Sequence, residues 1–70
     1  MQTIHIKDDF IKLGQALKFS GLAESGAEAK FAIQNGEVIV NGQVETQRGK
    51  KLTAGDEFTY KGQSFKVEKQ

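Results

Sequence analysis

The segment SGAEAKFAIQNGEVIVNG, from Ser25 to Gly42, decides the fold of this 70-residue chain. Ser25 and Glu28 have the spacing of a capping box, in which each side chain accepts a hydrogen bond from the other residue's backbone N–H. Three apolar residues then recur at helical spacing on one face: Ala29, Ala32 and Ile33. Gly36 stands where the C-terminus of a helix favours a residue at positive φ. The segment therefore predicts a capped helix that stops at a glycine.

The second half of the segment predicts a hairpin. Val38, Ile39 and Val40 favour a strand, and Asn41-Gly42 suits a two-residue type I′ turn. A return strand is expected over residues 43–46.

The residues before Ser25 predict one strand and one helix. Residues 3–7 alternate and include two β-branched isoleucines, which favours a strand that ends at Asp8 or Asp9, either of which can cap the helix that follows. The helix is predicted over residues 10–20, and its apolar stripe comprises Phe10, Leu13, Ala16 and Leu17. Gly14 is unfavourable inside a helix, so we expect another backbone to pass close to it.

The C-terminal part predicts a second hairpin. A strand is expected over residues 57–60, and a turn at Gly62-Gln63 would pair Tyr60 with Phe65 and Phe58 with Val67. This register places all four large side chains on one face. The predicted fold is α+β, in the order β-α-α-β-β-β-β, with two helices packed on a small, mostly antiparallel sheet.

Composition limits the class of protein. Seventy residues without cysteine predict a single domain, residues 1–70, with neither disulfides nor a cysteine metal site. No apolar run is long enough to cross a membrane and no signal peptide is evident, so we expect a monomer in the cytoplasm.

Catalytic chemistry has little support in the sequence. The one histidine, His5, lies in a predicted strand with no partner at a recognisable spacing. The carboxylate pairs lie at element boundaries, where caps and turns explain them, and no phosphate-binding loop or metal-ligand spacing occurs. We therefore expect no enzyme activity, no cofactor and no metal.

Positive charge is local rather than global. The formal net charge is +1, yet residues 46–54 hold Arg48, Lys50 and Lys51 without an acidic residue. A short run of this kind is commonly a solvated loop, and the alternative is a contact with an anionic partner.

Several motifs together resemble the S-four domain, the RNA-binding module named after ribosomal small-subunit protein four and also called the αL motif. The matching pieces, in order along the chain, are residues 11–18, Ser25, Glu28-Ala29-Lys30, Gly36, Val38-Ile39-Val40-Asn41-Gly42 and residues 51–57. The resemblance covers about residues 11 to 58 and is closest to small stand-alone bacterial members of the family.

The resemblance implies a function and a set of site residues. The chain would bind structured RNA, either ribosomal or transfer RNA, and a ribosomal subunit is a further partner that the resemblance implies. The second helix and the basic loop border one RNA-facing surface in the family, and a phosphate would also bind the N-terminus of the second helix. The implied RNA-binding residues are Lys12, Lys18, Ser25, Gly26, Lys30, Arg48, Lys50 and Lys51. The alternative is a protein–protein module whose basic loop meets an acidic partner.

Two phenylalanines lie off the predicted apolar faces. Phe31 could stack on a base beside Lys30 or pack against the N-terminal strand or the C-terminal hairpin, and we favour packing. Phe19 has no predicted role.

Overall fold

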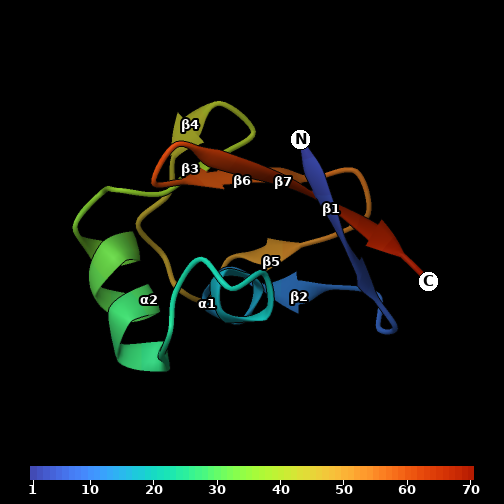
Figure 1. Cartoon of the computed structure of the whole chain (residues 1–70), viewed down its shortest axis with the longest axis horizontal. Helices are drawn as coiled ribbons and strands as arrows, with labels where there is room; N and C mark the ends of the chain where they lie inside the picture. Colours follow the sequence, from blue (N-terminus) through green and yellow to red (C-terminus); the bar gives the residue numbers. More distant parts are fainter.

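The computed structural model describes all residues from 1 to 70 and contains seven strands and two helices (Figure 1). In chain order they are β1 (Gln2–Ile6), β2 (Ile11–Lys12), α1 (Leu13–Phe19), α2 (Gly26–Gln34), β3 (Ile39–Val40), β4 (Gln43–Val44), β5 (Lys51–Leu52), β6 (Glu57–Tyr60) and β7 (Gln63–Lys69).

Five strands form one sheet in the order β1-β7-β6-β3-β4, and only the β1–β7 pair is parallel. Both helices lie on the same side of this sheet, and the short antiparallel pair β2–β5 lies at one end of α1 (Figure 1). The predicted α+β class with a mostly antiparallel sheet is confirmed. The sequence prediction lacked the two-residue strands β2 and β5.

The core lies between the helices and the inner face of the sheet. Seventeen buried apolar residues form one cluster, to which every helix and five of the strands contribute. The rings of Phe58 and Phe65 stack with their centroids 5.7 Å apart. Because burial of such side chains is worth about 1.5–3 kcal/mol each, this cluster fixes how the helices sit on the sheet.

The predicted start of the second helix is largely confirmed. The Ser25 Oγ accepts from the Glu28 N–H at 3.1 Å. The reciprocal bond was predicted to the wrong residue, because the Glu28 carboxylate accepts from the Glu24 N–H at 2.9 Å instead. A partly exposed glutamate can reach either N–H, and here the carboxylate on the Glu24 side also accepts from Lys61 Nζ, 3.1 Å away.

The predicted turns after this helix are also confirmed. Gly36 has a φ of 75°, and Asn41 and Gly42 have φ values of 50° and 84°, as a type I′ turn requires. The strands on either side are shorter than predicted. Val38 lies outside β3, although it is fully buried in the core.

The first helix was predicted to begin three residues too early. Residues 11 and 12 are strand, because Ile11 and Lys12 pair with Leu52 and Lys51. Lys12 therefore takes the N-cap position, and neither Asp8 nor Asp9 caps the helix. Asp9 instead forms an ion pair with Lys69, 2.7 Å away. Phe10 precedes the helix and is 38% exposed, so its predicted place in the apolar stripe is wrong.

The register of the last hairpin differs from the prediction by two residues. Phe58 pairs with Phe65 and Tyr60 pairs with Gln63. The turn is Lys61-Gly62, whose φ values of 54° and 75° make a tighter loop than the predicted Gly62-Gln63. A shift of two keeps every side chain on its predicted face, and Phe58, Tyr60, Phe65 and Val67 are all buried.

Replacing Gly36 with alanine should lower the free energy of unfolding by about 1 kcal/mol, because an alanine at positive φ is strained. Crowding adds nothing, since the nearest atom to an added Cβ is Val44 Cγ1 at 3.8 Å. Chemical denaturation would measure the effect. Gly49→Ala is the matched control, because Gly49 lacks positive φ and faces open space. Equal stability of the two variants would contradict this account of the helix end.

Candidate functional site

The basic loop between β4 and β5 is attached to the first turn of α1 through its backbone. The Leu13 N–H donates to the Lys50 carbonyl at 2.8 Å, and the Gly14 N–H donates to the Arg48 carbonyl at 3.2 Å. The first N–H groups of a helix have no partner within the helix, and the side chain of the N-cap residue Lys12 accepts from none of them. The Gln15 Oε1 accepts only from the Lys12 N–H, at 3.3 Å. Two loop carbonyls therefore do what a capping side chain usually does, and they fix the loop on the helix.

Gly14 makes this close approach feasible. A Cβ added to Gly14 would lie 2.8 Å from Cγ and 3.4 Å from Cδ of Arg48. The stem of Arg48 therefore lies against the helix backbone, in space that any other residue would occupy. The expected close passage of another chain segment at Gly14 is confirmed.

The loop, α1 and the start of α2 form the walls of a cleft of about 370 Å³ that is open to solvent. We call this the cationic cleft. It is lined by Lys12, Gly14, Gln15, Lys18, Gly26, Arg48 and Gly49. Three of these residues are basic and none is acidic, so the cleft concentrates positive potential.

A fourth cation extends the cleft along the β2–β5 pair. Lys12 and Lys51 are directly opposite each other in this ladder, so both side chains project from the same face. Like charges in this position destabilise a sheet by tenths of a kcal/mol. The Lys51 Nζ also lies 4.7 Å from the centroid of the Phe10 ring, a cation–π contact.

Ion pairs are confined to the other cations of the protein. Three of the ten Lys and Arg residues form salt bridges: Lys61 with Glu28, Lys66 with Glu68, and Lys69 with Asp9. None of the six basic residues predicted for the site has a carboxylate within salt-bridge distance. The hydrogen bond from Lys69 lowers the pKa of Asp9, while the pKa of Glu28 is lowered first by the Glu24 N–H and then by Lys61. These acids therefore stay ionised and paired outside the cleft.

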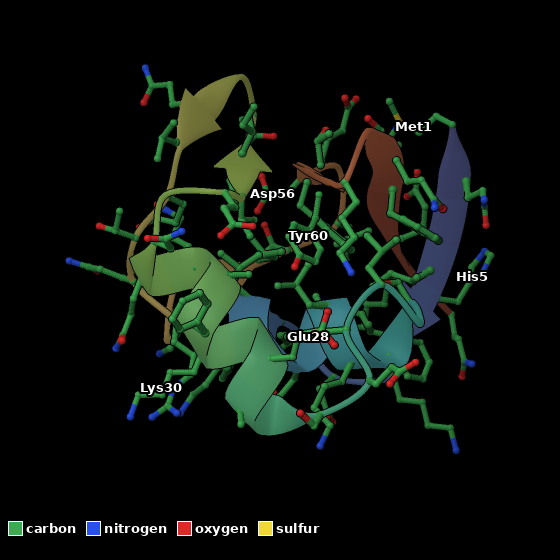
Figure 2. All side chains as sticks on the ribbon, turned by 60° about the vertical axis from the view of Figure 1, so that its left-hand side comes forward. Met1, His5, Glu28, Lys30, Asp56 and Tyr60 are labelled. Atoms are coloured by element: carbon green, nitrogen blue, oxygen red, sulfur yellow. The ribbon has the colours of Figure 1, made fainter.

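The N-terminus of α2 opens into the cationic cleft. Ser25 caps the helix, and no hydrogen bond uses the N–H groups of Gly26 or Ala27. A Cβ at Gly26 would meet nothing within 4 Å, so an anion can come close to the backbone there. Glu28, the acid in this turn, points to the opposite side of α2 from Lys30 (Figure 2).

The structure thus brings together most of the predicted site residues. Lys12, Lys18, Gly26 and Arg48 line the cleft, and Ser25 and Lys51 adjoin members of it. Lys30 is exposed one helical turn after Gly26. The side chain of Lys50 does not line the cleft. Burial raises the pKa of Asp56, but hydrogen bonds from Thr53 and Asn41 outweigh burial and lower this pKa, and the charge of Lys50 adds to the lowering.

Some lining residues were not predicted. Gln15 is uncharged and Gly49 has no side chain, so only the three-dimensional arrangement places them in the cleft. The contact between Phe10 and Lys51 needed the β2–β5 pairing, which the sequence did not indicate. The predicted packing of Phe31 is wrong, because its side chain is 68% exposed on the outer side of α2.

The structure has few features typical of enzymes, metal-binding proteins or membrane proteins. His5 is exposed on β1 and points away from the rest of the molecule (Figure 2). No three His, Asp or Glu side chains lie together as metal ligands would. Neither helix has the length and apolar character to cross a membrane.

Comparison with known proteins places this geometry in a family. Residues 4–68 match the S4 domain family. The chain is 43% identical over 61 residues to the Escherichia coli protein named "Putative RNA-binding protein YbcJ", with 87% of each chain covered. It is 40% identical over 65 residues to the Bacillus subtilis protein named "Probable ribosome maturation protein RlbA", covering 91% of this chain and 92% of the relative. The solution structure of E. coli YbcJ, described as revealing an αL motif involved in RNA binding, superposes with a TM-score of 0.74 at 40% identity over 97% of this chain and 87% of YbcJ.

Gly14→Ala should move the Arg48 side chain, because the new methyl group would lie only 2.8 Å from its Cγ, closer than two carbon atoms can approach. We expect the fold to persist, since Arg48 is exposed and can shift outward. NMR would detect the change as an altered Arg48 Nε–Hε signal. Gly26→Ala, in the same cleft but in open space, should leave that signal in place. An unchanged Arg48 signal in Gly14→Ala would contradict the close packing described here.

Proposed function

Because the chain belongs to the S4 domain family, we propose that it is a non-catalytic protein that binds structured RNA through the cationic cleft. The ligand we propose is ribosomal or transfer RNA, and the name of the B. subtilis relative favours a ribosomal particle. Such a protein would act in the cytoplasm. The αL motif described for YbcJ supports the RNA-binding part of this proposal.

The single observation that carries the proposal is the separation of paired and unpaired cations. Every basic residue at the cleft lacks an acidic partner, while the three ion pairs involve lysines of the last hairpin and the C-terminal strand. A protein evolved only for stability gains nothing from placing Lys12 opposite Lys51. Phosphate groups would neutralise this repulsion, and their condensed counterions would be released on binding.

The proposed mode of binding has two parts. The side chains of Lys12, Lys18, Arg48 and Lys51 would contact successive phosphates of an RNA backbone, and Lys30 would extend this row along α2. One phosphate would accept from the unused N–H groups of Gly26 and Ala27, with the Ser25 hydroxyl beside it. These contacts fix the position of an RNA without reading its sequence.

A charge-matched pair of triple variants tests the proposal. Lys12, Arg48 and Lys51 are replaced by alanine in one variant, and Lys61, Lys66 and Lys69 in the other. Binding of a short RNA hairpin is measured across several salt concentrations. The first variant should bind more weakly and reduce the slope of log K against log[salt] by about 0.7–0.9 for each lost phosphate contact. The second has the same net charge and should keep the parent slope.

Three results would contradict the proposal. Equal changes in both variants would indicate attraction to net charge alone. An unchanged slope in the first variant would leave the loop and the β2–β5 pair as solvated surface. Preference for poly-glutamate over the RNA hairpin would favour the alternative, a module that binds an acidic protein partner.

A further inference from the structure

A second hollow adjoins the cationic cleft along α1. It has a volume of about 640 Å³, and we call it the Phe19 groove. Its apolar surface comes mainly from Phe10, Ile11 and Phe19. Gln15 and Lys18 line both the Phe19 groove and the cationic cleft, so the two hollows are continuous over one side of α1.

Phe19 presents a largely exposed ring to the groove. It is the last residue of α1, and 63% of its side chain is accessible. Gln15 lies one helical turn before it, and Lys18 is the preceding residue. Phe19 and Lys18 both line the groove, and Lys18 has no carboxylate partner.

Phe10 joins the groove to the cleft at a second point. Its ring is 38% exposed and lies under the Lys51 ammonium group, which projects from the same face as Lys12. Two aromatic rings of the groove are therefore each next to a cation of the cleft. A ligand that fits this arrangement needs a planar apolar part and a negative charge close to it.

Resting on the proposed RNA binding, we propose that the Phe19 groove holds one unpaired nucleobase of the bound RNA, stacked on Phe19. An unpaired nucleotide has both required parts, and its phosphate would lie at Lys18, where the groove meets the cleft. The volume is in the range of small-ligand sites, which is ample for one base. Lys18 is the lining residue that the groove shares with the cationic cleft and that carries a charge, so the RNA backbone would stay on the Lys18 side while the base points into the groove.

An RNA duplex and the same duplex with one extra unpaired adenosine provide the test. The wild-type protein should bind the bulged duplex more tightly, by about 5- to 100-fold, the range for stacking of one base on an aromatic side chain. Phe19→Ala should remove this preference and leave the affinity for the perfect duplex unchanged. Phe31→Ala is the matched control, since Phe31 is 68% exposed and lines neither hollow.

Each other result overturns the inference. Equal binding of the two duplexes by the wild type would mean that the protein holds no unpaired base. A preference that survives Phe19→Ala, or one that is lost in Phe31→Ala, would mean that the base does not stack on Phe19. Equal weakening of both duplexes by Phe19→Ala would mean that the ring only supports the cleft, and the groove would then be open to an apolar peptide. Failure of the wild type to bind either duplex would instead contradict the proposed function.

Discussion

Two backbone hydrogen bonds determine the arrangement of the candidate site. The carbonyls of Lys50 and Arg48 accept from the Leu13 and Gly14 N–H groups at 2.8 and 3.2 Å. The first two N–H groups of α1 are thereby satisfied without a side chain at the N-cap, and a segment distant in sequence is held against the helix. Together with the β2–β5 pairing, these bonds fix the basic residues of the loop relative to Lys12 and Lys18. Gly14 is the steric condition for this contact, because its missing side chain leaves room for the stem of Arg48.

The same attachment explains why charge repulsion is tolerated at the site. The apolar side of the β2–β5 pair is anchored by Leu52, which is fully buried, and by Ile11, which packs on the core. Burial of these two side chains is worth a few kcal/mol, whereas an exposed pair of like charges costs tenths of a kcal/mol. Lys12 and Lys51 can therefore be held together on the outer face. This small loss of stability would be a consequence of the RNA-binding role proposed for this surface.

The sequence predicted best the features that depend on neighbouring residues. Ser25, Gly36 and Asn41-Gly42 each impose a local backbone geometry, and the structure has all three. Features set by distant segments were predicted less well. Ile11 and Lys12 are strand only because residues 51 and 52 pair with them, and periodicity over so few residues cannot separate strand from helix. The family resemblance grouped six cations, but the direction of the Lys50 side chain depends on the backbone of the loop, whose carbonyl at Lys50 points to α1.

An NMR titration of the whole protein with a short RNA hairpin tests the central claim most directly. The claim is that α1, the start of α2 and the loop between β4 and β5 form one RNA-binding surface. The largest amide shifts should then occur together at residues 12–15, at Gly26 and Ala27, and at residues 48–51. These segments are far apart in sequence and meet only at the cationic cleft. Shifts confined to the outer face of the sheet, around Thr3 and Lys66, would contradict the account.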